Sequence, residues 1–234
     1  MDKISPIFVS LFSITQYSIS MIISFVNEKG GVGKTTLVTN VAACFAQRGF
    51  KICLVDTDKQ QASTVWYNNR EKGDIFISNC TEPKALSKHL SQLIDQYDLV
   101  LVDGRPHIDE MLDRTMLASD VVVIPVKPSL YDFRSFENFF DRYEQVKKVK
   151  EMGGGKLLAF VLFNEFKERN ILSRELREAI EEYELGKLET RIATREAYKI
   201  TPKAGIGVTE YSDDKAKDEV ERLVTELEKI IKNF

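Results

Sequence analysis

Short apolar runs alternate with longer segments of helical character along most of the chain. The apolar runs occupy residues 22–26, 51–55, 75–78, 99–102, 121–125 and 157–163. The segments of helical character occupy residues 34–48, 60–70, 83–96, 109–118 and 130–150. Strands that are apolar throughout are typical of a parallel sheet with helices on both faces. The pattern predicts an α/β fold with a twisted, mainly parallel sheet flanked by helices.

A last helix is predicted over about residues 214–232. Its apolar positions recur on one side at Val220, Leu223, Val224, Leu227, Ile230 and Ile231. A single apolar stripe of this kind is typical of a helix that packs on a core, so we expect it to cover the sheet.

The chain length and composition favour one globular domain over residues 21–234. The 234 residues contain no linker rich in Gly, Pro and Ser, and 43% hydrophobic with 29% charged residues is ordinary for a globular protein. The net charge of −3 provides no electrostatic footprint for nucleic acid over the whole molecule. Nucleic-acid binding would therefore require a local basic patch.

The first 20 residues differ from the rest of the chain. They are apolar enough to resemble a signal sequence or a membrane anchor, but Ser, Thr, Gln and Pro interrupt them, and Met21 directly precedes the first predicted strand. We interpret residues 1–20 as an extension or as an upstream misreading of the start site. A membrane anchor is the alternative.

A glycine-rich turn joins the first predicted strand to the first predicted helix. It reads Lys29-Gly30-Gly31-Val32-Gly33-Lys34-Thr35-Thr36. Glycines let backbone N–H groups approach phosphates, and the N-terminus of the following helix adds positive potential. Lys34 is then placed for the β- and γ-phosphates, Thr35 for Mg²⁺ and Thr36 for the α-phosphate. The sequence predicts a phosphate-binding loop for ATP with Mg²⁺.

The loop departs from the general phosphate-loop pattern because Glu28 replaces the first glycine and Lys29 follows it. In these residues the chain resembles the ParA/MinD family of ATPases, which carry a deviant Walker A box. The resemblance implies a cytoplasmic switch that dimerises around two ATP molecules. It also implies that Lys29 reaches the partner's nucleotide, where a cation would neutralise charge developing on the phosphates. A solvated loop lysine is the alternative.

Acidic residues close two of the apolar strands. Asp56 and Asp58 follow the strand at 51–55, and Asp103 closes the strand at 99–102 in the Walker B pattern. The resemblance implies that Asp58 orients the attacking water and that Asp56 supports the Mg²⁺ shell. Asp103 is expected beside Mg²⁺, through water. Arg105 and His107 follow Asp103, and contact with nucleotide or partner and simple solvation both remain open for them.

The resemblance covers residues 21–234 and is closest to small plasmid-partition ATPases of the ParA type. It places an adenine contact at Asn164, which ends a strand and whose amide can pair with the edge of a base. Asparagine after a strand is also an ordinary turn residue, which is the alternative reading.

The resemblance to ParA implies plasmid or chromosome partition, in which the ATP-bound homodimer binds DNA without sequence preference. A centromere-binding adaptor protein would stimulate hydrolysis. Candidate cations for the DNA phosphates recur at intervals of four: Lys187, Arg191, Arg195, Lys199 and Lys203. Residues 188–192 look like a strand and Pro202 interrupts any helix, so separate solvated charges are the alternative.

Two other functions use the same scaffold. A MinD-like switch acts at a membrane through a basic amphipathic C-terminal helix, but residues 228–234 are short and mixed in charge, so core packing is favoured for them. A metabolic synthetase would need a second substrate-binding domain, which the sequence does not indicate. An iron–sulfur reductase would need cysteine ligands, and Cys44, Cys53 and Cys80 do not have that spacing.

Overall fold

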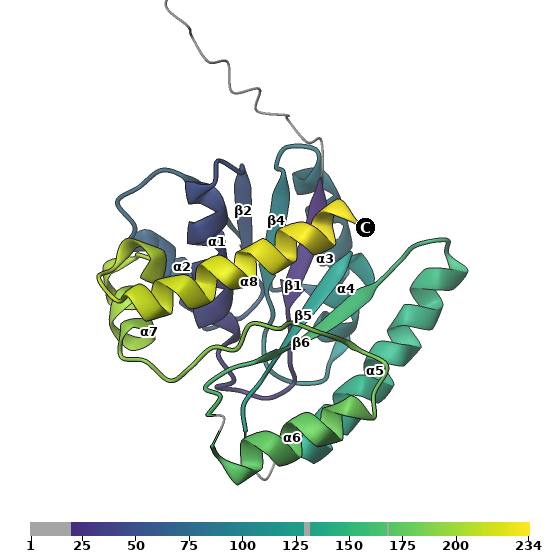
Figure 1. The fold of residues 1–234 in the computed structure, drawn as a ribbon. Helices are drawn as coiled ribbons and strands as arrows, with labels where there is room; N and C mark the ends of the chain where they lie inside the picture. The colour runs from purple at the N-terminus through teal and green to yellow at the C-terminus, as the bar shows by residue number, and fades with distance from the viewer. Residues whose placement is uncertain (1–19, 129–131, 168) are drawn as a thin grey trace, which may run out of the picture.

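A parallel sheet of seven strands forms the centre of the protein, in the order β3-β2-β4-β1-β5-β6-β7 (Figure 1). The computed structural model describes residues 20–128, 132–167 and 169–234, so the predicted extension lies outside the described residues except for Ser20. The strands are β1 (Met21–Phe25), β2 (Ile52–Asp56), β3 (Ile75–Asn79), β4 (Leu99–Asp103), β5 (Val121–Val126), β6 (Leu158–Phe163) and β7 (Gly186–Lys187). The predicted α/β fold with a parallel sheet is confirmed.

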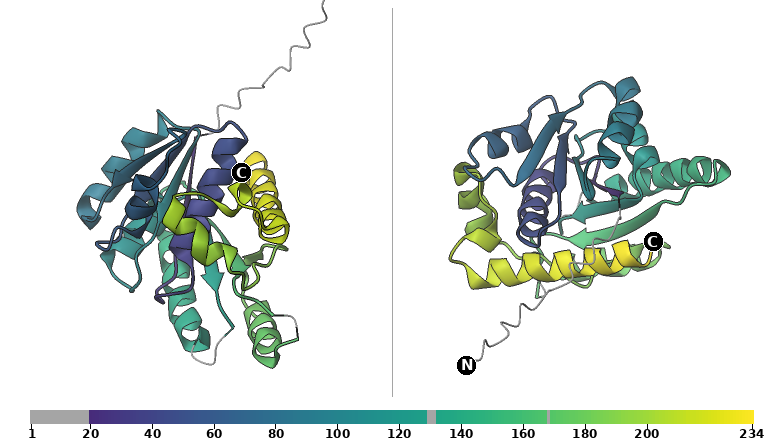
Figure 2. Two further views of the ribbon diagram at one scale, coloured as in Figure 1. Left: turned by 90° about the vertical axis from the view of Figure 1, so that its left-hand side faces the viewer. Right: turned by 90° about the horizontal axis from the view of Figure 1, so that it is seen from above.

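Helices follow the strands and cover both faces of the sheet (Figure 2). They are α1 (Lys34–Gln47), α2 (Ala62–Asn68), α3 (Pro83–Ile94), α4 (Glu110–Ala118), α5 (Asp132–Met152), α6 (Ile171–Glu181), α7 (Ala197–Ile200) and α8 (Asp214–Lys232). Two short 3₁₀ turns, η1 (Thr201–Ala204) and η2 (Val208–Glu210), precede α8. None of the described helices combines the length and apolarity needed to cross a membrane.

Successive residues of the central strands face opposite helical layers. In β1, Ile23 and Phe25 belong to the cluster that includes α1 and α8, whereas Ile22 belongs to the cluster with Leu86 and Leu90 of α3. Because side chains alternate along a strand, a strand covered on both sides buries both sets of side chains, and β1 is apolar except for Ser24. This double coverage explains the nearly continuous apolar runs in the sequence.

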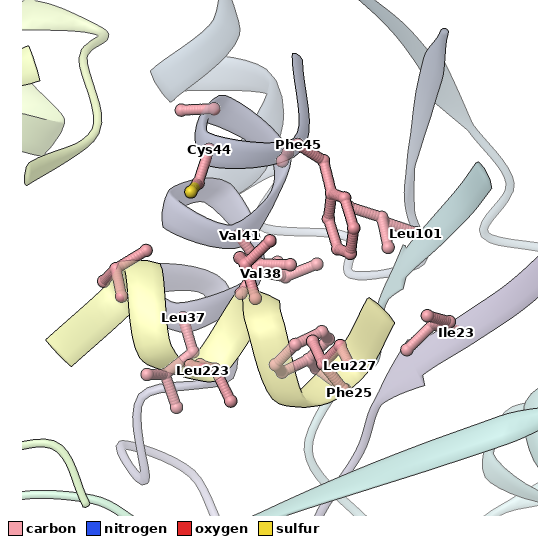
Figure 3. Packing of buried hydrophobic residues seen from close by; sticks show 14 of the residues in the cluster. Ile23, Phe25, Leu37, Val38, Val41, Cys44, Phe45, Leu101, Leu223 and Leu227 are labelled. Atoms are coloured by element: carbon pink, nitrogen blue, oxygen red, sulfur yellow. The ribbon is translucent and has the colours of Figure 1, made fainter. Parts of the chain in front are cut away.

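The α8 helix packs its predicted apolar stripe into the core. Its fully or nearly fully buried apolar residues are Ala216, Val220, Leu223, Val224, Leu227 and Ile231. Figure 3 shows Leu223 and Leu227 beside Leu37, Val38 and Val41 of α1. Each such leucine contributes roughly 1.5–3 kcal/mol through burial, so α8 anchors the helix that follows the phosphate loop.

Between β6 and α8 the structure differs from the sequence-based expectation. The expected strand over residues 188–192 is wrong, because pairing is limited to Gly186–Lys187 and a single bridge between Asn164 and Ile192. The helix α6 is not predicted by the pattern either. Its buried residues Ser173, Leu176 and Ile180 follow helical spacing, but between them lie charged residues. The region is built largely from turns and side-chain contacts.

Candidate nucleotide-binding site

The candidate site lies at the carboxyl edge of three neighbouring strands. In the register of the sheet, Asp103 of β4 pairs with Phe25 of β1 on one side and with Asp56 of β2 on the other. The segments after these strands are therefore brought together at one edge, as expected for ligand sites of parallel sheets. Segments that lie far apart in the sequence thus converge beside the phosphate loop.

Glycine is required inside the phosphate loop by both backbone and packing. Gly31 and Gly33 adopt positive φ angles of 73° and 97°, which side chains other than glycine rarely allow. A Cβ atom on Gly33 would lie 2.3 Å from the Asn164 Nδ2 atom. The helix α1 begins immediately afterwards at Lys34, so its free N–H groups point toward the space where phosphates are expected.

Buried amides brace both ends of the loop. Asn27 donates through Nδ2 to the Pro125 carbonyl at 2.8 Å and accepts the backbone N–H of Lys29 at 3.0 Å. Asn164 donates through Nδ2 to the Val32 carbonyl at 2.7 Å. Sequence reasoning missed Asn27, although a polar residue directly after a buried strand was the available signal. The structure therefore shows Asn164 as a loop brace, and its predicted adenine contact stays a prediction.

The Lys34 side chain is buried within the site rather than extended into solvent. Its Nζ donates to the Lys29 carbonyl at 2.8 Å. Burial lowers the pKa of Lys34 to about 8, although attraction to Asp103 and Asp58 opposes that shift. The amine thus lies near both carboxylates, and the negative charge of an incoming phosphate would raise its pKa again.

Asp103 is a buried carboxylate with one oxygen available to a ligand. Burial raises its pKa to about 7, against hydrogen bonds from Ser63 and Thr35. Ser63 donates to Oδ2, whereas Oδ1 is buried without a hydrogen-bond partner among the described residues. A hydroxyl beside an under-coordinated carboxylate suits Mg²⁺, which prefers oxygen ligands and retains water. Thr35 and Asp103 therefore fit the predicted Mg²⁺ site.

Asp56 and Asp58 lie two positions apart and have different surroundings. Both oxygens of Asp56 accept hydrogen bonds, from the Asp58 backbone N–H at 3.0 Å and from Thr64 N–H at 3.1 Å. Burial raises the pKa of Asp56, and these hydrogen bonds oppose the shift. Asp58 is only partly buried, and its Oδ1 accepts the Gln60 N–H at 3.0 Å. Asp56 thus holds the backbone of this segment, and its predicted role at the metal stays a prediction. Asp58 is the more accessible of the two acids.

The segment after Asp103 is held against the phosphate loop. Gly104 packs so closely on β1 that a Cβ atom would lie 2.7 Å from the Phe25 carbonyl oxygen. His107 has a φ of 92° and donates its N–H to the Glu28 carbonyl at 2.8 Å, and Arg105 forms a 2.5 Å ion pair with Asp109. The close contact with β1 explains why position 104 is glycine.

A pocket adjoins the α1 end of the loop. It is lined by Gly33, Thr36, Leu37, Asn164, Glu165, Ile192, Ala193, Thr194, Arg195, Tyr198 and Lys199. Its far wall is fixed by Glu219, which accepts hydrogen bonds from Arg195 at 2.6 Å and from the Tyr198 hydroxyl at 3.0 Å. A pocket that continues from the phosphate loop is where the remainder of a nucleotide would lie.

The five candidate DNA-binding cations have unequal surroundings. Lys187 is exposed on β7, and Lys203 is exposed on η1. Arg191 lies over the Phe166 ring at 4.9 Å, Arg195 is paired with Glu219, and Lys199 lies 3.6 Å from Glu196. Their regular sequence spacing therefore does not correspond to one helix, and the DNA surface stays a prediction.

Comparisons with known proteins identify the family of the chain and show the same fold. Residues 23–205 match the family model described as the CobQ/CobB/MinD/ParA nucleotide binding domain. The chain is 29% identical over 209 residues to the maintenance of carboxysome distribution protein A of Halothiobacillus neapolitanus, covering 86% of this chain and 93% of that protein. It is 26% identical over 156 residues to the chromosome-partitioning ATPase Soj of Thermus thermophilus, covering 53% and 62%.

A solved structure shows the same fold. The septum site-determining protein MinD of Pyrococcus horikoshii, complexed with Mg-ADP, superimposes with a TM-score of 0.70 at 18% identity. The match covers 90% of this chain and 96% of that protein. The agreement therefore extends across the sheet and both helical layers.

Proposed function

Because the chain belongs to the CobQ/CobB/MinD/ParA nucleotide-binding family, we propose that it is an ATPase that binds ATP with Mg²⁺ and acts as a dimerising switch. The observation that carries the proposal is the convergence of Lys34, Asp103 and Asp58 at one edge of the sheet. Both carboxylates act electrostatically on the Lys34 amine. This arrangement provides a cation for phosphate, an oxygen ligand for Mg²⁺ and an accessible carboxylate for water.

Each residue has a separate role in the proposed hydrolysis. The backbone around Gly31 and Gly33 binds the phosphates, and Lys34 neutralises their charge. Thr35 and Asp103 would hold Mg²⁺, which would stabilise negative charge on the phosphates. Asp58 orients the attacking water.

Dimerisation is proposed to complete the site through Lys29. The backbone N–H of Lys29 donates a hydrogen bond to the Asn27 side chain, so the Lys29 backbone has a defined position at the start of the loop. A cation supplied by a partner subunit would stabilise developing phosphate charge in the same way as an arginine finger. The dimer would then persist only while the triphosphate remains, so the rate of hydrolysis would set the lifetime of the dimer.

For the biological role, we propose partition of a plasmid or chromosome in the cytoplasm. In this proposal the ATP-bound dimer binds DNA without sequence preference, and a centromere-binding adaptor protein stimulates hydrolysis. The relatives support a positioning role in two forms, since one is a chromosome-partitioning ATPase and another maintains carboxysome distribution. The MinD-like alternative needs an amphipathic helix for the membrane, but the apolar side of α8 is buried.

The test is binding to non-specific duplex DNA at low and moderate salt, with ATP, ADP or no nucleotide. We expect a complex with ATP that weakens as salt rises, because phosphate contacts release counterions. The double substitution Lys187→Ala/Lys203→Ala should weaken this complex more than Lys215→Ala/Lys217→Ala, which removes two lysines of α8. If the protein binds no DNA in any nucleotide state, the partition role is contradicted. The alternative is then an ATPase that positions its cargo through protein contacts.

A further inference from the structure

Arg70, just beyond the end of α2, is a buried cation with an unusually complete set of partners. Its guanidinium donates to Glu210 at 2.8 and 3.0 Å, to Asp74 at 2.8 Å through each of two nitrogens, and to the Gly205 carbonyl at 3.0 Å. The Arg70 side chain has no exposed area, and that of Glu210 is 5% exposed. Burial would raise the pKa of Glu210, but hydrogen bonds from Arg70 and Lys72 lower it to about 2.

Backbone contacts join the same two segments. A Cβ atom on Gly205 would lie 2.3 Å from the Arg70 backbone nitrogen, so the chain passes directly against the end of α2. The Trp66 indole of α2 donates to the Ile206 carbonyl at 3.2 Å. Asn40 of α1 accepts the Val208 N–H at 2.7 Å, which ties the same segment to the helix after the phosphate loop. Residues 205–210 therefore connect α1 with α2.

The opposite end of α2 contacts the acids of the candidate site. Ser63 donates to Asp103, and Thr64 donates its N–H to Asp56 at 3.1 Å. Asp58 lies in the same short connection, where its carbonyl accepts the Gln61 N–H at 3.1 Å. A helix of seven residues is too short to be stable alone, so its position depends on contacts at both ends.

We propose that Arg70 and Glu210 are positioning residues for hydrolysis. Their ion pair fixes the far end of α2 on residues 205–210, and α2 in turn holds the Asp58 connection at the geometry needed for water attack. This inference rests on the proposed role of Asp58. The ion pair lies at the end of α2 opposite to the acids, so it affects turnover through α2 and leaves phosphate binding to α1 and its loop.

The test replaces both charges together, because removing one would leave the other buried without this partner. Arg70→Met/Glu210→Gln preserves much of the side-chain volume and removes the ion pair. The matched control is Arg48→Met/Glu228→Gln, another arginine–glutamate pair, 2.8 Å long, which joins the end of α1 to α8. Thermal midpoint, ATP affinity, kcat and Trp66 fluorescence are measured for each. Trp66 is the only tryptophan in the chain, and its ring lies 5.2 Å from the Arg70 guanidinium.

We expect the Arg70/Glu210 variant to bind ATP as the wild type does but to lose about tenfold to 100-fold in kcat, the effect of slight misplacement of a reacting group. Acrylamide should quench Trp66 more strongly in this variant without nucleotide. The Arg48/Glu228 control should keep both properties. A folded Arg70/Glu210 variant with wild-type kcat overturns the proposal.

If the double variant does not fold, Arg70→Lys provides the second measurement. Lysine keeps the positive charge but cannot donate to Glu210, Asp74 and Gly205 in the same fork-like arrangement. A folded Arg70→Lys protein should show reduced kcat with unchanged ATP affinity, and wild-type kcat there also overturns the inference. Absence of hydrolysis in the wild type would instead contradict the proposed function. In that case, unchanged Trp66 quenching in the Arg70 variants would separately show that the Arg70–Glu210 ion pair does not fix the position of α2.

Discussion

The region from β1 to β4 and the region from Asn164 to Glu210 are built by different means. In the first, neighbouring parallel strands fix the phosphate loop and the acids through the register of the sheet. In the second, strand pairing beyond β6 consists of the two-residue β7 and one bridge. There, Glu219 and Glu226 of α8 reach back to hold Arg195 and the Thr190 N–H, the latter at 2.8 Å. Backbone pairing positions the first region, and long-range side-chain contacts position the second.

This difference changes the meaning of a charged residue in each region. A polar residue at a strand end of the first region faces the candidate site because the sheet places it there. A cation in the second region can instead be part of the fold, as Arg195 is with Glu219. Regular spacing of cations is therefore weak evidence for a binding surface where no regular element carries them.

The largest expected effect comes from Lys34→Ala, which removes the buried cation of the first region. We expect ATP affinity to fall by roughly 100-fold or more, equivalent to about 2.7 kcal/mol, because the phosphates lose their internal counter-charge. Fluorescent-nucleotide titration measures the change. Lys59→Ala, an exposed lysine beside Asp58, is the control and should bind normally. Near-normal affinity of Lys34→Ala would separate the loop from nucleotide binding.

The next effect is expected from Asp58→Ala. It should retain ATP binding and dimerisation but lose about 100-fold in the rate of phosphate release, as expected when a water-orienting acid is removed. Asp56→Ala should instead lower the thermal midpoint, because Asp56 holds the backbone of Asp58 and Thr64. Single-turnover hydrolysis and thermal unfolding distinguish the two acids. Normal hydrolysis by Asp58→Ala would refute its catalytic assignment.

Lys29→Ala should affect assembly more than binding. The monomer should keep nearly normal ATP affinity, whereas the ATP-dependent dimer should weaken by roughly tenfold, about 1.4 kcal/mol, because the proposed cation in trans is lost. Sedimentation with a non-hydrolysable ATP analogue measures the dimer, and Lys59→Ala again serves as the control. Unchanged dimerisation together with unchanged turnover would remove the proposed role of Lys29.

Much of the fold could be predicted because double coverage of the sheet leaves a direct sequence signal. Strands such as Leu99–Asp103 are apolar up to the final acid, and α8 has one clear apolar side. The connection after β6 could not be predicted in the same way. Its short elements are stabilised by Glu219 and Glu226, which lie far along the chain. The local spacing of apolar and polar residues does not predict such long-range contacts.

The candidate site could be predicted at positions where the backbone conformation or the place in the sheet determines the residue type. Glycine at position 33 is required by a positive φ, and Asp103 at a strand end is placed by the sheet. Bracing residues such as Asn27 and Arg70 were not found, because their roles depend on partners that the sequence does not place nearby. Asp56 shows the remaining difficulty, since the sequence alone does not reveal that a carboxylate beside a site also holds backbone N–H groups.

The smallest effect is expected from Asn164→Ala, which joins the two regions. Its amide nitrogen holds the Val32 carbonyl, while the oxygen of an asparagine amide can accept from the amino group of adenine. Losing one hydrogen bond worth about 1 kcal/mol should weaken ATP binding by roughly fivefold. Asn170→Ala, which removes the side-chain cap of α6, is the control.

Competition between ATP and GTP separates the two roles of Asn164. If the residue contacts adenine, Asn164→Ala should bind ATP more weakly and lose part of its preference over GTP, because guanine presents an acceptor at the matching position. If Asn164 only braces the loop, affinity for both nucleotides should fall by the same factor, since both place the same phosphates there. An equal loss would assign Asn164 to the backbone geometry of the first region and remove it from base recognition.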